Sequence, residues 1–291
     1  TLIALFGVAV GVCFAVAVCC RLFDKRSSFD MGFAATEKHW WKQVAVGAAA
    51  GCLGVCVMVL SLSTFGRLNF AGVMINQTSM PTVVAIIVVM LTFAFEVVAE
   101  EVLFRGYLLW NSMESVGAHV GNRKVAAATA STLSGFLWAA VVAILSPNVE
   151  QESPLSFVLI FGYGIFFALV AIWTRSLGPT LGLHFAWNCS ENVLFSLVPE
   201  DGQTHSAVVA SRVGLFHGSI HGATWITGGA FGPEGGVAGP IGIATALCVF
   251  SLWFRRFGQR RESIQDLATK EADYDEGVGL LGRNSNEESA Y

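Results

Sequence analysis

The chain has 291 residues, of which 54% are hydrophobic and only 13% are charged, and its mean hydropathy is +0.61. Soluble domains carry about 25% charged residues, so this composition excludes an ordinary soluble domain and indicates an integral, multi-pass membrane protein. The formal net charge of -4 says little about partners, because it sums connections on opposite sides of a membrane. We expect the lipid bilayer as a partner and no nucleic acid.

Long apolar segments follow one another along the chain. A run of about 20 apolar residues crosses a bilayer as a helix. Seven such segments are visible, at 1–21, 44–65, 82–110, 125–146, 155–174, 177–198 and 236–254. They predict an all-α, polytopic transmembrane helical bundle of about seven spans over residues 1–254, or eight if a helix precedes Thr1.

Basic residues gather in alternate connections between these segments, for example at Lys25 and Arg123, and four arginines follow the last segment. Basic connections face the cytoplasm, which predicts a cytoplasmic C-terminus. Residues 255–291 are polar and acidic, and we expect a disordered tail there. The connection 199–235 falls on the opposite side, and its glycines favour turns over a stable helix.

The third segment ends in the charged sequence AEEVLFRGYLLW. A charge at bilayer depth costs about 2.5–3.5 kcal/mol and usually marks function or a paired interior. Glu101 and Arg105 stand four residues apart and can pair on one helix face, either inside the bundle or as a salt bridge at the membrane surface. Glu100 is left without that partner, and Glu96 lies one turn before it. When two carboxyl groups lie as close together as Glu96 and Glu100, they do not both ionise easily, which suits one of them to act as a general base.

A second polar cluster, GLHFAWNCSEN, lies in the sixth segment. His184 and Asn188 are four residues apart, and Asn192 continues the same stripe. An imidazole and a carboxamide side by side can donate hydrogen bonds to an oxyanion, or they can simply link helices. A depth count puts Glu100 near the cytoplasmic end of its span, where the span of His184 begins, so the two clusters could meet.

These two clusters carry a family resemblance. EEVLFR resembles the E-E-x-x-x-R motif of the CAAX prenyl protease and bacteriocin-processing family of intramembrane glutamic proteases, also called the Abi family, and HFAWN resembles its H-x-x-x-N motif. The context RSLGPTLGLHFAWN and the sequence TGGAFGPEGG are similar to bacterial members. The resemblance covers roughly residues 20–255, and it favours a bacterial plasma membrane.

The resemblance implies a role for each of the five predicted catalytic residues. Glu100 would activate water, Arg105 would hold Glu101, and His184 and Asn188 would stabilise the oxyanion. The implied substrate is a membrane peptide or lipidated protein, such as a prenylated CAAX sequence. We expect no cofactor and no metal.

One family motif, F-x-x-x-H, has no counterpart with a histidine, because none occurs between residues 120 and 183. An alignment on Pro147 and Asn148 replaces this histidine by Ala143, and an alignment on Phe136 replaces it by Ala140. Loss of such an acid–base partner commonly costs about 10²–10⁴ in rate. An enzyme therefore competes with a family member that has lost catalysis and serves as a membrane binding or bacteriocin-immunity protein. A transporter that uses Glu96 and Glu100 is a third hypothesis, although paired broken helices are missing.

Overall fold

The computed structural model describes residues 2–25, 32–33, 38–145, 154–199, 213–253 and 255–256. The chain separates into two compact units, Thr1–Ala246 and Leu247–Tyr291, and the first unit holds the sheet and the candidate site. The tail predicted at 255–291 lies outside the described residues, apart from 255–256, so it stays a prediction.

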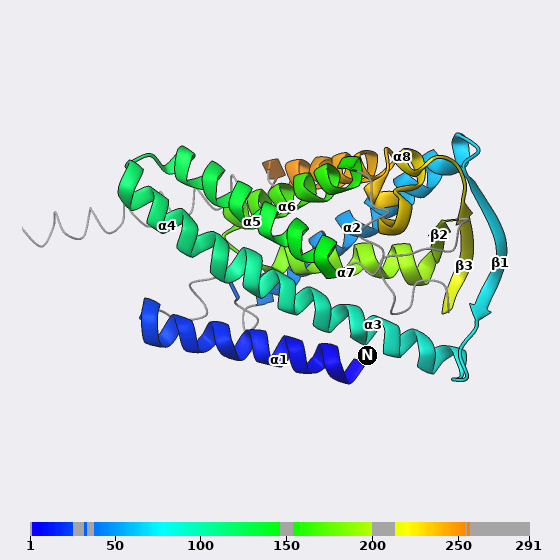
Figure 1. Ribbon diagram of the computed structural model, residues 1–291, viewed down its shortest axis with the longest axis horizontal. Coiled ribbons are helices and arrows are strands. Elements are labelled where there is room, and N and C mark those ends of the chain that lie inside the picture. The colour runs from blue at the N-terminus through cyan, green and yellow to red at the C-terminus, as the bar shows by residue number, and fades with distance from the viewer. Residues whose placement is uncertain are drawn as a thin grey trace, which may run out of the picture. The chain divides into compact units, whose positions relative to one another are not determined.

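Five helical segments in the described part of the chain are long and apolar enough to cross a membrane (Figure 1). This confirms the polytopic helical bundle. The five are α1 with its π-helical end (Leu2–Cys19 and Cys20–Asp24), α2 (Lys38–Thr64), the continuous helix Thr82–Val120, α5 (Arg123–Leu145) and α6 (Pro154–Thr174).

Five of the seven predicted spans meet this criterion of length and composition among the described residues. The segment at 177–198 contains α7 (Gly178–Cys189) and the π-helical turn η5 (Ser190–Leu194), of 12 and 5 residues. The segment at 236–254 contains a shorter apolar helix, Gly239–Trp253. Both are shorter than the roughly 20 residues that cross a bilayer core.

The third helical segment is much longer than predicted. It runs for 39 residues through α3 (Thr82–Glu100), the π-helix η3 (Glu101–Leu108) and α4 (Leu109–Val120), which is about 58 Å at 1.5 Å per residue. Polar residues after Trp110 lower the hydropathy but do not stop the helix, which ends where Gly121 adopts a left-handed φ of 67°. Glu100 therefore lies midway along this helix, and its depth in the bilayer stays a prediction.

Glycines bring the helices that carry polar residues into close contact. A Cβ atom on Gly47 or Gly51 of α2 would collide with the backbone of α7, and one on Gly182 of α7 would collide with α2. Between α5 and α6, a Cβ on Gly135 would lie 2.8 Å from the backbone nitrogen of Ile165. Small residues allow this approach in membrane bundles, and here they fix α7 against α2 and α5 against α6.

A three-stranded sheet, absent from the sequence prediction, lies at one end of the helices in Figure 1. Strand β3 (Val213–Ile220) pairs antiparallel with β1 (Leu68–Asn76) and parallel with β2 (Leu197–Pro199). Part of the connection expected to form turns is thus a strand. Its partner β1 is more than 130 residues away in the chain, so no local sequence pattern could predict the pairing.

The TGGAFGPEGG sequence does form turns, as expected from its glycines. It contains the end of α8 (Thr224–Thr227) and two short 3₁₀ turns, η6 (Gly229–Phe231) and η7 (Pro233–Gly235). Gly228 has a φ of 79°, and a Cβ there would collide with the carbonyl of Gly232. The Ser156 hydroxyl on α6 donates hydrogen bonds to the carbonyls of Gly228 and Gly235, which ties this segment to the bundle.

Candidate active site

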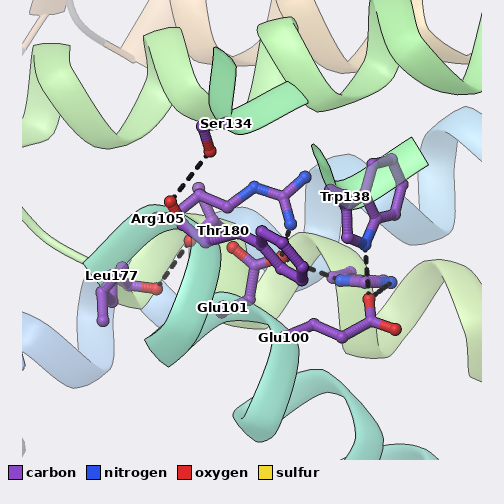
Figure 2. Close-up of polar contacts among 9 residues, drawn as sticks. Glu100, Glu101, Arg105, Ser134, Trp138, Leu177 and Thr180 are labelled. Carbon is purple, nitrogen blue, oxygen red and sulfur yellow. Dashed lines mark hydrogen bonds and ion pairs between the residues drawn. The ribbon is translucent and has the colours of Figure 1, made fainter. Parts of the chain in front are cut away.

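Glu101 and Arg105 form an ion pair inside the bundle (Figure 2). Arg105 Nη1 donates to Glu101 Oε1 at 3.2 Å, and both side chains are 0% exposed. The guanidinium also lies 4.5 Å from the ring centroid of Trp138 and 5.1 Å from that of Phe167, where the aromatic faces attract a cation. The predicted pairing is confirmed, and its burial excludes a salt bridge at the membrane surface.

His184 connects this pair to Glu100. Its Nδ1 lies 2.9 Å from Glu101 Oε1, and its Nε2 lies 3.8 Å from Glu100 Oε2. Because ionised Glu101 can only accept, Nδ1 carries a hydrogen, and Nε2 carries a second one only in the imidazolium form. In that form the charges of Glu100, Glu101, Arg105 and His184 sum to zero. His184 can therefore donate to an oxyanion only while it is protonated.

Glu100 has a different environment from its neighbour Glu101. Its side chain is 21% exposed, and its Oε2 accepts a 2.6 Å hydrogen bond from Trp138 Nε1 on α5 (Figure 2). Sequence reasoning missed Trp138, which is 38 residues away, because nothing local shows which face of α5 meets α3. One carboxylate of the E-E pair is thus locked in an ion pair, and the other stays available.

A cavity of about 80 Å³ lies against Glu100, large enough for several water molecules. His184 and Asn188 line it, as do Asn192 and Glu96, so the two polar clusters of the sequence do meet. The predicted Asn192 stripe therefore faces the same cavity.

The residues of α5 that line this cavity are not the ones that either alignment of the F-x-x-x-H motif placed at the histidine. Neither Ala140 nor Ala143 is among the lining residues, whereas Trp138 and Val142, four residues apart, both are. Neither position that the alignments give for the histidine therefore faces the cavity. The periodicity of an apolar helix leaves its register open, and the packing of α5 on its neighbours decides it.

A second pair of carboxyl groups lines the same cavity, and sequence reasoning missed it. Trp187 Nε1 lies 2.9 Å from Glu191 Oε2 and also 2.9 Å from Glu234 Oε2. The hydroxyl of Tyr163 on α6 donates to the backbone oxygen of Glu234 at 2.8 Å. The GPEGG sequence, interpreted only as a turn, thus carries a buried acid, Glu234. The sequence did hold a signal for the other member of the pair, because Glu191 is a charged residue in the same apolar segment, seven residues after His184.

Glu234 lies outside the five spanning segments, in the turns before Gly239. Burial raises its pKa from 4.5 to about 7, the charge of His184 and hydrogen bonds with Trp187 and Glu191 oppose this rise, and Glu100 adds to it. A raised carboxyl pKa favours folding while the group is protonated in both states, and this contribution is lost as pH rises from about 4.5 through 7. The shift corresponds to roughly 3 kcal/mol.

We therefore expect the melting temperature of the detergent-solubilised protein to fall between pH 5 and pH 8, with a shallower fall for Glu234→Gln, which stays neutral. Glu114→Gln, at an exposed position on α4, serves as the matched control and should keep the parent slope. An equal slope in Glu234→Gln and the parent would show that Glu234 does not titrate in this range.

The described residues hold no group of three or more His, Cys, Asp or Glu side chains arranged to bind a metal ion. The cavity instead joins carboxylates, an imidazole and carboxamides. Such a set can move protons and donate hydrogen bonds, which are the requirements of hydrolysis by an activated water.

A family comparison agrees with this chemistry. The model of the family described as "Type II CAAX prenyl endopeptidase Rce1-like" matches residues 82–190, a region that holds Glu100, Glu101, Arg105, His184 and Asn188. No curated protein and no solved structure gives a significant match. Residues 82–190 of this membrane protein are therefore similar to the Rce1-like family of CAAX prenyl endopeptidases, a family of proteases.

Proposed function

We propose that this protein is an intramembrane endopeptidase that hydrolyses a peptide bond of a membrane-associated substrate, with Glu100 as the base that activates water. The observation that carries the proposal is the contrast within the E-E pair: Glu101 is ion-paired and fully buried, whereas Glu100 faces the cavity beside His184. A carboxylate that contacts a water-sized cavity is placed to accept a proton from that water.

Each step of the proposed reaction uses a group in this cavity. Glu100 takes a proton as the water oxygen attacks the carbonyl carbon, and the charge on the carbonyl oxygen is stabilised by protonated His184 and by the Asn188 carboxamide. The C–N bond then breaks, and the proton on Glu100 passes to the leaving amine. The Glu101–Arg105 pair orients His184 through its Nδ1.

The substrate class follows from the family. A membrane peptide or a lipidated protein is proposed, with a prenylated CAAX sequence as the first substrate to test. We further propose a bacterial plasma membrane with the C-terminus in the cytoplasm. Reagent accessibility of a cysteine placed at Lys25 in a cysteine-free variant tests this orientation, since labelling only from outside would contradict it.

A second candidate is a family member that binds peptides without cleaving them, such as a bacteriocin-immunity protein. The observation in its favour is that α5 presents Trp138 and Val142 to the cavity and no acid–base group. The carboxylate–imidazole pair of Glu100 and His184 is nevertheless intact, which favours the peptidase.

The test is cleavage by the purified protein in liposomes. The probes are a farnesylated peptide ending in a C-a-a-X sequence and the same peptide without the farnesyl group, and mass spectrometry identifies the products. We expect cleavage at one bond, faster for the farnesylated peptide. If the folded protein binds these peptides but cleaves neither, the non-catalytic candidate is correct.

A further inference from the structure

Trp138 is held in one orientation by its surroundings. Its side chain is buried, with the Arg105 guanidinium 4.5 Å from its ring centroid. The His184 ring lies 5.9 Å away at an angle of 89°, and the Phe167 ring lies 6.1 Å away. In this position its only hydrogen-bond donor, Nε1, lies 2.6 Å from Glu100 Oε2. A donor fixed by packing on several sides positions the group that accepts from it.

The position of Trp138 in α5 relates its contact with Glu100 to the F-x-x-x-H motif. The cavity-facing pair of α5 is Trp138 and Val142, which has the spacing of the F-x-x-x-H motif with Trp at the Phe and Val at the His. The helix therefore lacks the imidazole at the second position and offers an indole N–H one turn earlier. Val142, which carries no polar group, cannot contact Glu100 through a hydrogen bond.

We propose that Trp138 is a positioning residue for Glu100, and that its indole N–H replaces the hydrogen bond that a histidine of α5 would give to the water-activating centre. This inference rests on the proposed function. An indole N–H donates and never accepts, so Trp138 orients the Glu100 carboxylate but transfers no proton to or from it. The proton taken from water therefore stays on Glu100 until the leaving amine accepts it.

The direct test is Trp138→Phe, which keeps an aromatic ring beside Arg105 and removes the N–H. A hydrogen bond to a charged group is worth about a 10- to 100-fold change in an equilibrium or rate, so we expect kcat to fall by about that factor, with KM little changed. Trp173→Phe, on the exposed side of α6, is the matched control and should behave as the parent.

The double variant Trp138→Phe/Val142→His tests the replacement itself. It restores the F-x-x-x-H pair on the cavity wall, and we expect it to recover much of the activity that Trp138→Phe loses. A merely structural role for Trp138 would predict no recovery, since an imidazole at residue 142 does not restore the packing of the indole against Arg105. Rates are compared per folded molecule.

A spectroscopic readout covers the case in which Trp138→Phe does not fold. The chain has eight tryptophans, and ¹⁵N labelling of their indoles should show one N–H signal shifted far downfield by its short bond to a carboxylate. In Glu100→Gln the acceptor is a neutral amide, so this signal should move upfield while the others stay. Identical indole spectra for the two proteins would overturn the inference.

The outcomes separate the inference from the function on which it rests. If Glu100→Gln is inactive while Trp138→Phe matches the parent in kcat and KM, Trp138 is not a positioning residue and the proposed function stands. If Glu100→Gln retains cleavage, or the parent cleaves no probe, the proposed function falls and this role for Trp138 falls with it.

Discussion

Glu100→Gln is expected to lower kcat for peptide cleavage by about 10²- to 10⁴-fold, the range commonly attributed to a general base. The amide has the size of the carboxylate, and its oxygen can still accept from Trp138, but it cannot take a proton from water. The folded structure should therefore survive, with a melting temperature close to that of the parent. Initial rates on the farnesylated peptide, per folded molecule in liposomes, provide the measurement.

The matched control for this variant is Glu114→Gln, the same chemical change at an exposed position outside the cavity. It should leave kcat and KM unchanged. If Glu100→Gln cleaved the peptide at the parent rate, Glu100 would not be the base and the proposed mechanism would be wrong. A loss of activity accompanied by unfolding would instead assign Glu100 a structural role.

Glu101→Ala should destabilise the protein by about 3–5 kcal/mol, the usual cost of removing one partner of a buried ion pair. The variant leaves the Arg105 guanidinium at 0% exposure without its carboxylate and leaves His184 Nδ1 without its acceptor. Two polar atoms of Arg105, Nε and Nη2, already lack a hydrogen-bond partner among the described residues, so little compensation is available. Denaturant unfolding in detergent measures the loss.

The double variant Glu101→Gln/Arg105→Met is the control for this prediction. It removes both charges while keeping the side-chain volumes, and replacing a whole buried pair in this way is often nearly neutral for stability. We expect it to unfold much closer to the parent than Glu101→Ala does. A Glu101→Ala protein with parent-like stability would show that the pair contributes little to the fold.

Local spacing was enough to predict the parts of this site that lie on one helix. Glu101 and Arg105 meet because side chains four residues apart share a helix face, and they do so even within the π-helical η3. The same spacing placed His184 and Asn188 together on α7, where both line the cavity. Hydropathy likewise indicated a helical bundle, because lipid leaves few other ways to satisfy the backbone.

Contacts between distant segments were decided only by the tertiary structure. Whether Trp138, Ala140, Val142 or Ala143 faces Glu100 depends on the rotation of α5, which its close packing on α6 through Gly135 sets. The position of Glu100 along its helix depended on the continuation of that helix through polar residues to Val120.

The second carboxyl pair shows the same limit. Glu191 and Glu234 are 43 positions apart, and they meet at Trp187 because the turns before Gly239 are tied to α6 by Ser156. A helical period of 3.6 residues determines neighbours within one helix. This period carries no information on which helix faces meet. The sequence by itself therefore determined the helical bundle and the E-E and H-x-x-x-N clusters. Only the packing of distant segments placed Trp138 and Glu234 beside those clusters.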